Sequence, residues 1–227
     1  IRAGVLEEGT IKLLSKAGVL NRIKNEGFIH DGIFLSSKNR GFRIDFKTLI
    51  NKKVTVYGQT EVTKDLYEIR ERKNGKVFNS VKNVKPHQFE EDTPFVTCMI
   101  NGKNKTIHCD FIVGCDGFHG ISRKSIPKNK IKIFERIYPF GWLGILSETP
   151  PVSKELIYAN HETGFALASM RNDNLSRYYI QTPINEKIEE WSDNRFWVEL
   201  KNRLPDESVD HLVTGPSIEK SIAPLRS

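Results

Sequence analysis

Four polar residues in the second half of the sequence could together bind a carboxylate. Ser169 and Arg171 lie two positions apart in one segment, and Arg177 and Tyr179 lie two positions apart in the next. Side chains two positions apart in a β-strand point to the same face of the sheet. An arginine can donate two parallel hydrogen bonds to a carboxylate, and serine and tyrosine hydroxyls can complete its oxygen shell. The spacing therefore permits a clamp for a planar organic acid.

The clamp depends on the turn between these two segments. If residues 172–176 form a five-residue loop, Ser169 lies opposite Tyr179. In the same register Arg171 lies opposite Arg177, so that all four side chains share one face. A loop one residue shorter would divide them between the two faces. The alternative interpretation is an ordinary polar sheet surface with salt bridges.

A glycine-rich sequence from Gly114 to Gly120 follows the apolar segment Phe111 to Val113, which we predict to be a buried strand. Glycine lets the backbone approach a ligand closely, and such turns hold cofactor pyrophosphates in nucleotide-binding folds. Residues 122–126 can begin a helix whose N-terminal N–H groups favour an anion, and Arg123 adds a positive charge. The alternative is a tight Asp-Gly turn without a ligand.

A regular pattern of elements is expected to position these residues. The first half should contain a helix from Ala3 to Ala17 that stops at Gly18, a hairpin of strands 32–35 and 42–46, and a strand at 54–57 followed by a helix capped by Thr60. A ribbon of strands at 84–89, 95–100 and 106–108 follows. The second half should contain strands at 142–147, 156–159, 164–171 and 177–182, a helix capped by Ser192, and a short segment at 205–212. No terminating element is expected at 222–227. The strands after Pro139 would therefore carry the clamp.

The sequence GCDGFHGISR at 114–123 resembles the Asp-Gly motif of the aromatic-ring flavoprotein hydroxylases. Further segments resemble the members of that family that act on 4-hydroxybenzoate. They are VTVYGQTEVT at 54–63, YPFGWLG at 138–144, ELIYANH at 155–161, SRYYIQTP at 176–183, DNRFWVELKNRLP at 193–205 and VTGPSIEKSIAPLRS at 213–227. The resemblance covers essentially the whole chain, so it applies to the fold as well as to single motifs.

The resemblance implies an α/β fold in which an incomplete Rossmann-like FAD-binding domain is interleaved with a β-sheet-rich substrate domain. The FAD-binding domain is expected at residues 1–28 and 55–136, and the substrate domain at residues 29–54 and 137–227. The change to β-rich sequence after Pro139 supports this division.

The resemblance also assigns residues to the cofactors FAD and NADPH. The matched residues are Arg2 and Gln59 for FAD, Asp116 and Gly117 for the flavin and nicotinamide pyrophosphates, and His119 and Arg123 for NADPH. Arg177 resembles an arginine linked to flavin movement, which implies a conformational role. Without the resemblance, Gln59 would be a polar residue at a helix end and Arg123 an exposed partner for a carboxylate.

The implied reaction converts 4-hydroxybenzoate to 3,4-dihydroxybenzoate with FAD, NADPH or NADH, and O2. Ser169, Arg171 and Tyr179 match its contacts with the substrate. Tyr158 matches the tyrosine at the substrate phenol, where a hydrogen bond favours the phenolate and activates the ring. Taken alone, Tyr158 would more often be a core residue with a satisfied hydroxyl. Two alternatives stay open, a related hydroxylase of another phenolic acid and a non-catalytic, anion-binding fragment.

The composition fits a globular protein that is not built for membranes or nucleic acid. Of the 227 residues, 38% are hydrophobic, and no apolar run approaches the ~20 residues of a membrane span. Cys98, Cys109 and Cys115 lack CxxC spacing, which argues against disulfides and zinc and favours a reducing cytoplasm. The net charge of +7 includes lysines at 124–132, which could be a solvated surface or attract an anion. Aromatic residues are not interleaved with them, as nucleic-acid binding would require.

The sequence begins at Ile1 without an initiator methionine or a signal peptide, so we expect it to start within a longer protein. The family's N-terminal GxGxxG turn would precede Ile1, and its second flavin-contacting Gly-Asp motif would follow Ser227. A chain with these limits is not expected to hold FAD normally. For the full-length protein, the resemblance implies a homodimer.

Overall fold

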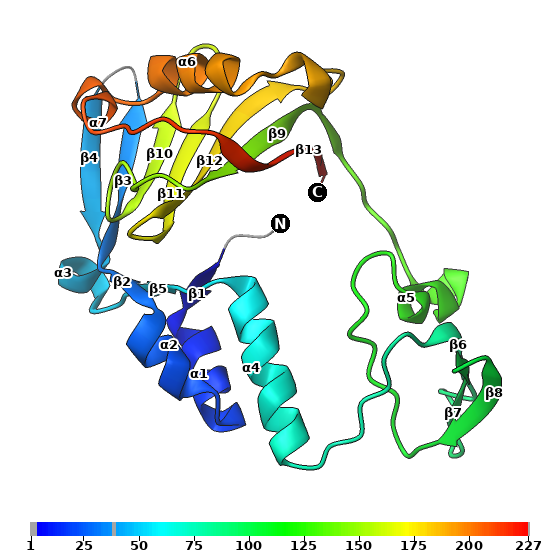
Figure 1. Ribbon diagram of the computed structural model, residues 1–227. Coiled ribbons are helices and arrows are strands. Elements are labelled where there is room, and N and C mark those ends of the chain that lie inside the picture. The colour runs from blue at the N-terminus through cyan, green and yellow to red at the C-terminus, as the bar shows by residue number, and fades with distance from the viewer. Residues whose placement is uncertain (1–3, 38–39, 227) are drawn as a thin grey trace. The chain divides into compact units, whose positions relative to one another are not determined.

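A seven-stranded sheet holds the four residues of the expected clamp (Figure 1). The structure is a computed structural model that describes residues 4–37 and 40–226. The strand order is β13-β9-β12-β11-β10-β3-β4, and neighbouring strands are antiparallel except for β3 and β10. The strands are β3 (Gly32–Ser37), β4 (Arg40–Asp45), β9 (Ile137–Ser147), β10 (Leu156–Asn160), β11 (Ala166–Asn172), β12 (Leu175–Pro183) and β13 (Ser217–Arg226). The predicted hairpin and the four predicted strands after Pro139 are confirmed.

Helix α6 (Asp193–Arg203) packs against this sheet and begins at the predicted cap. The Ser192 side chain accepts a hydrogen bond from the Arg195 backbone N–H at 3.1 Å, which satisfies one donor of the first turn. The large side chains that α6 buries are Phe196, Trp197 and Leu200. Burial of each such side chain contributes about 1.5–3 kcal/mol to folding, so α6 is held by packing more than by its cap.

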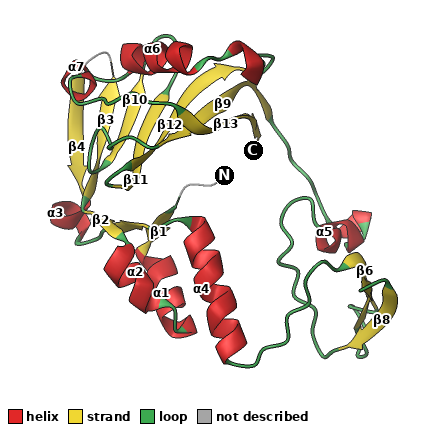
Figure 2. Cartoon of the chain, viewed as in Figure 1, coloured by secondary structure: helices red, strands yellow, loops and turns green. Residues whose placement is uncertain are grey.

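The two faces of the sheet differ in what covers them. On one face, Ile157 and Tyr178 belong to the main hydrophobic core together with α6. The short helix α7 (Asp206–Val209) lies on the same side (Figure 2). Because side chains alternate along a strand, the neighbouring residues Tyr158 and Tyr179 point to the opposite face. The sheet therefore separates a helix-covered core from a second face that carries the expected clamp.

A three-stranded sheet of order β1-β5-β2 lies in the same unit of the chain. Its strands and the remaining helices of this unit are β1 (Val5–Glu7), β2 (Phe28–His30), β5 (Val54–Val56), α1 (Glu8–Ala17), α2 (Leu20–Glu26), α3 (Phe46–Ile50), α4 (Gln59–Arg72) and the 3-10 helix η2 (Ile188–Glu190). The Arg22 guanidinium on α2 pairs with Asp65 and Glu61 on α4, and the Tyr57 hydroxyl donates to Asp65 at 2.8 Å. These contacts fix the position of the start of α4.

Two predicted helix boundaries are wrong. Residues 5–7 form a strand instead of a helical turn, because they pair with Val54–Val56 and so satisfy their backbone in a ladder. Helix α1 then ends as predicted at Gly18, whose φ of 91° is left-handed. Helix α4 begins at Gln59 after an N-cap at Gly58 that has no side-chain hydrogen bond, so Thr60 is not its cap.

Residues Asn74–Glu135 form a separate unit. Its antiparallel sheet, β6 (Lys82–His87), β7 (Phe95–Ile100) and β8 (Lys103–His108), confirms the predicted ribbon and is followed by helix α5 (Ile121–Ser125) and the 3-10 helix η1 (Lys128–Lys130). The predicted buried strand from Phe111 to Val113 is wrong. This segment pairs with no strand among the described residues, and Phe111 is 86% exposed and Val113 80%. A buried strand needs neighbours that satisfy its backbone and cover its faces, and this unit provides none.

The strand β13 is not predicted by the sequence pattern. It lies at an edge of the large sheet and pairs with β9, with register shifts after Ser217 and after Pro224. Pro224 has no N–H to donate, which suits an edge strand. This proline and the two register shifts interrupt the alternation of apolar and polar residues by which a strand is recognised in the sequence. The pairing places Glu219 opposite Leu146.

None of the described helices is long and apolar enough to cross a membrane. Within residues 4–37 and 40–226, no group of three or more His, Cys, Asp or Glu side chains is placed to hold a metal ion.

Candidate active site

The register between β11 and β12 differs from the predicted one. Ser169 lies opposite Arg177, and Leu167, not Ser169, lies opposite Tyr179. The turn is tight, because Asn172 pairs with Leu175 and the Asn174 backbone N–H donates to the Asn172 side chain at 2.9 Å. Between Met170 and Asn172 the strand β11 has one more residue than the facing part of β12, so Arg171 forms a β-bulge without a partner in the ladder. Ser169, Arg177 and Tyr179 still share one face of the sheet, as the clamp requires.

Arg171 lines a cavity of about 710 Å³ in the first unit. The start of α4 lines the same cavity through Gly58, Gln59 and Thr60. Leu146 and Glu219 line it from β9 and β13. Two residues that the sequence separates widely, Gln59 and Arg171, are therefore brought to one cavity. Its volume is in the range of small-molecule sites.

The Arg171 guanidinium is buried and has no internal partner. Both of its Nη atoms are buried without a hydrogen bond among the described residues. Burial lowers the pKa of Arg171, with a smaller opposing effect from Tyr179 and a further lowering by the charge of Arg177. An unpaired buried charge is unfavourable until a partner satisfies it. An anionic ligand would supply that partner.

Arg177 is fully buried and is held by two contacts. Its Nη1 lies 3.3 Å from Glu219 Oε1, an ion pair whose angle does not meet the geometry of a hydrogen bond. Its guanidinium carbon lies 5.0 Å from the centroid of the Tyr179 ring, within the range of a cation–π contact. The Arg177 charge is thus already matched by a carboxylate, whereas the Arg171 charge is not.

Tyr158 lies on the same sheet face but lines a different cavity. Tyr158 is opposite Leu167, which in turn is opposite Tyr179, so two strand spacings, roughly 10 Å, separate the two tyrosine backbones. The Tyr158 cavity has a volume of about 460 Å³ and includes Phe42 and Phe165. Burial raises the pKa of Tyr158, which keeps its hydroxyl neutral and able to donate. The Ser169 hydroxyl donates to the Met170 carbonyl at 3.2 Å.

Gly144 supports the clamp and is missed by sequence reasoning. A Cβ added at Gly144 would lie 2.6 Å from Tyr179 Cε1 and 3.2 Å from Arg177 Nη2. Only the absence of a side chain at this position lets the Tyr179 ring lie flat against β9. The YPFGWLG segment contains this glycine, but its contact across strands requires the observed pairing of Gly144 with Tyr179.

We expect Gly144→Ala to weaken binding of an aromatic carboxylate, with benzoate as the probe, about tenfold and to lower stability by about 1–3 kcal/mol, because the new methyl group displaces the Tyr179 ring. Titration calorimetry and urea unfolding measure the two effects. Gly9→Ala is the control, since a Cβ at Gly9 meets nothing within 4 Å and alanine favours the helix. Unchanged affinity in Gly144→Ala would show that the ring position is not set by this glycine.

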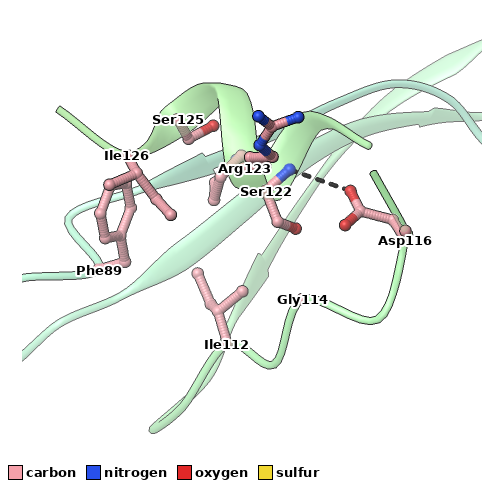
Figure 3. A pocket seen from close by; sticks show the side chains of 10 residues that line it. Phe89, Ile112, Gly114, Asp116, Ser122, Arg123, Ser125 and Ile126 are labelled. Atoms are coloured by element: carbon pink, nitrogen blue, oxygen red, sulfur yellow. Dashed lines mark hydrogen bonds between the residues drawn. The ribbon is translucent and has the colours of Figure 1, made fainter. Parts of the chain in front are cut away.

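The glycine-rich turn of the second unit is held by Asp116 (Figure 3). Asp116 Oδ2 accepts a hydrogen bond from the Ser122 backbone N–H at 3.0 Å, and this contact, the largest cause, lowers the pKa of Asp116. A Cβ at Gly120 would collide with the Asp116 carboxylate, and one at Gly114 would lie 2.6 Å from Ser122 Cβ. Gly117 has a left-handed φ of 71°. The carboxylate therefore fixes the turn onto the start of α5.

Arg123 lies beside this turn in a cavity of about 550 Å³ that Asp116 and Gly117 also line. Its Nη1 donates to the Phe118 carbonyl at 3.2 Å, and its guanidinium carbon is 3.9 Å from the Phe118 ring centroid. His119 packs edge-on against Phe118 at 5.0 Å and is not among the residues that line the cavity. Arg2 lies outside the described residues.

His30 is a second residue that sequence reasoning misses. It is 1% exposed at the end of β2, and neither ring nitrogen has a hydrogen-bond partner among the described residues. Burial lowers the pKa of His30, and the charge of Glu155 opposes this effect only partly. Its sequence neighbours, Ile29 and Asp31, form no motif that marks it as functional.

The buried His30 predicts a loss of stability in mild acid. Its folded-state pKa lies below the ordinary value of about 6.5, so the unfolded chain binds the proton first as the pH falls. Above about pH 6.5 the neutral His30 costs no stability. As the pH falls below this value, the free energy of unfolding declines by up to about 1.4 kcal/mol per pH unit until the folded-state pKa is reached. Urea midpoints between pH 5 and 8 measure this slope. His30→Leu should flatten it, whereas His119→Gln, at an exposed position, should leave it unchanged.

Comparison with known proteins identifies relatives of this chain. A family model described as an FAD binding domain matches residues 1–227. The p-hydroxybenzoate hydroxylase of Acinetobacter baylyi is 54% identical over 228 residues, covering 100% of this chain and 56% of that protein. The chain therefore spans about half the length of this curated relative.

Solved structures share the fold at lower identity. PqsL of Pseudomonas aeruginosa, in complex with 2-aminobenzoylacetate, has a TM-score of 0.78 at 16% identity and covers 99% of this chain and 63% of that chain. The p-nitrophenol 4-monooxygenase PnpA of Pseudomonas putida has a TM-score of 0.74 at 14% identity and covers 99% of this chain and 59% of that chain. The expected α/β fold class is confirmed. Since the family model covers the whole sequence, the chain belongs to the family of proteins built on this FAD binding domain.

Proposed function

We propose that the protein is an FAD-dependent monooxygenase that converts 4-hydroxybenzoate to 3,4-dihydroxybenzoate with NAD(P)H and O2. The observation that carries this proposal is the buried Arg171 guanidinium, which has no internal hydrogen-bond partner and shares a cavity with Gln59. A bound carboxylate would satisfy this group with two charge-assisted hydrogen bonds. The 54% identical p-hydroxybenzoate hydroxylase supports the choice of acid.

In this proposal the two ends of the substrate contact different strands. Arg171, with Ser169 and Tyr179, holds the carboxylate. Tyr158 lies on the same face, on the strand next to Arg171 and Ser169 and two strands from Tyr179. It donates to the phenolic oxygen, which favours the phenolate and raises electron density at the ring carbon that is hydroxylated. The raised pKa of Tyr158 fits the role of a neutral donor. Holding both ends of the ring fixes its reacting carbon in position.

The residues around the Arg171 cavity fit a bound flavin. Gln59 offers an amide to the ring system, and the start of α4 presents backbone N–H groups without a side-chain cap. When bound, FAD reduced by NAD(P)H supplies the activated oxygen. The role of the chain is to bind and orient the substrate, exclude water and hold the phenol proton. Arg2 completes the proposed FAD contacts, and Arg177 accompanies movement of the flavin.

The second unit is proposed to serve the pyrophosphates and NADPH through Asp116, Gly117, His119 and Arg123. Because Asp116 is ionised and bonded to the Ser122 N–H, its proposed role is to shape the turn so that backbone N–H groups meet the phosphates. Arg123 supplies the positive charge. The proposed division assigns residues 1–28 and 55–136 to the cofactor and residues 29–54 and 137–227 to the substrate. A homodimer in the cytoplasm is proposed for the full-length protein.

The test is product formation by the FAD-loaded, full-length protein. Incubation with 4-hydroxybenzoate and NADPH or NADH should yield 3,4-dihydroxybenzoate, detected by mass spectrometry, and the substrate should perturb the flavin spectrum. Substitution of 2-hydroxybenzoate or 3-hydroxybenzoate tests for a hydroxylase of another phenolic acid. Binding of simple anions with no flavin perturbation by any phenolic acid would favour the non-catalytic alternative.

A further inference from the structure

The Arg171 cavity contains an imbalance of charge. Its charged lining residues among the described part of the chain are Glu61, Arg171 and Glu219. Glu61 pairs at 2.6 Å with Arg22, a guanidinium outside the cavity lining that Glu26 and Asp65 also share, so Glu61 has a partner other than Arg171. Glu219 pairs with Arg177, whose side chain is only 1% exposed. Two buried arginines thus face a single available carboxylate.

The position of Glu219 makes this pairing specific. Arg177 and Glu219 both lie opposite Leu146, one on β12 and the other on β13, so β9 runs between the two partners. Their side chains meet across that strand at 3.3 Å on the clamp face. The Glu219 side chain is 32% exposed and also lines the cavity, so it lies between the arginine that it neutralises and the space open to a ligand.

We propose that Glu219 limits the site to one ligand carboxylate by acting as the internal counter-ion of Arg177. Arg171 is then the one cation without a partner among the described lining residues, and a monocarboxylate supplies that partner. An aromatic acid with a second, neighbouring carboxylate meets the negative charge of Glu219 instead of a free arginine. Glu219 is a specificity-determining residue in this scheme, which rests on the proposed substrate clamp.

Benzoate and benzene-1,2-dicarboxylate are the probes, and their dissociation constants are measured by calorimetry on the FAD-loaded, full-length protein. The wild-type protein should prefer benzoate. Glu219→Gln frees the Arg177 charge, so the dicarboxylate should bind at least about tenfold more tightly relative to benzoate than in the wild type. Equal changes in both affinities would overturn the proposal, because a merely structural role would not discriminate between the two acids.

Glu199→Gln is a matched control. Glu199 is 33% exposed and pairs at 3.1 Å with Arg203, whose side chain is 5% exposed, so the pair resembles Glu219 and Arg177 in burial. It lies on α6, away from the residues that line the cavity. Loss of the Glu199–Arg203 ion pair should affect stability but leave the ratio of the two dissociation constants unchanged. A shift in the ratio equal to that of Glu219→Gln would contradict the assignment.

Arg177→Gln provides a second test that does not leave a buried arginine unpaired. Glu219 is then released and should compete with the ligand for Arg171, weakening benzoate binding at least about tenfold. The double variant R177Q/E219Q removes both charges and should recover the wild-type preference. Benzoate affinity unchanged in Arg177→Gln would sink the proposal. Absence of benzoate binding in the wild-type protein would instead reject the clamp itself.

Discussion

In the full-length protein, Arg171→Lys should weaken 4-hydroxybenzoate binding by roughly 10-fold to 150-fold, although it keeps the positive charge. Lysine cannot form the two parallel hydrogen bonds of the guanidinium fork, and loss of one charge-assisted hydrogen bond typically costs about 1.5–3 kcal/mol. The guanidinium is buried without an internal partner, so no protein group can compensate for the loss. Substrate-induced changes in flavin absorbance or fluorescence would report the affinity.

Two controls separate the clamp from a general effect on the protein. 4-Hydroxybenzamide has no carboxylate, so it should bind the wild-type protein poorly and lose much less on substitution. Arg203→Lys changes another buried arginine, which donates to the Gln181 carbonyl at 2.7 Å, and should reduce stability without changing substrate affinity. Equal losses for the acid and the amide would return Arg171 to the role of a structural arginine.

The strands around the clamp could be predicted because their signals are local. Alternation in the segments after Pro139 and the Ser192 cap identify β9 to β12 and α6 with small errors at their ends. The two-residue period also places Ser169, Arg177 and Tyr179 on one face. Register was not recoverable, because it depends on a bulge at Arg171 and on a turn hydrogen bond from Asn174. Neither leaves a clear trace in the pattern of residue types.

Features that depend on distant parts of the chain could not be predicted. The meeting of Gln59 with Arg171 in one cavity, and of Glu219 with Arg177 across β9, requires tertiary structure. The segment Phe111 to Val113 shows the opposite failure. Its apolar residues predict burial, yet burial depends on neighbouring strands, and the described part of its unit contains none that pair with it. Hydrophobic pattern alone does not specify a partner.

The proposed domains and the observed units divide the chain differently. Helix α4 and the strand β5 belong to the same unit as the large sheet, whereas the proposed cofactor domain joins them to residues 74–136. The observed units are defined by contacts within the chain, whereas the proposed domains are defined by the ligand that each is proposed to bind. The two divisions share a boundary close to Arg136, where the β-rich segment begins.

Tyr158→Phe should slow hydroxylation about 100-fold or more while leaving substrate binding and flavin reduction largely intact. The substitution removes the donor that stabilises the phenolate, and loss of one donor to a developing or full oxyanion typically has an effect of this size. The carboxylate clamp on β11 and β12 is unchanged. The ring that remains still packs against Phe165, whose centroid lies 5.9 Å from that of Tyr158.

Rapid-mixing kinetics separates the two half-reactions, because reduction by NADPH and transfer of oxygen change the flavin spectrum differently. The expected loss falls on oxygen transfer alone. Tyr178→Phe is the matched control, since Tyr178 lies on β12, two strands from Tyr158, and points into the core on the opposite face. It should leave both half-reactions at wild-type rates. An unchanged rate of hydroxylation in Tyr158→Phe would show that the Tyr158 hydroxyl only fills space, and the phenol end of the substrate would then have to contact another part of the sheet face.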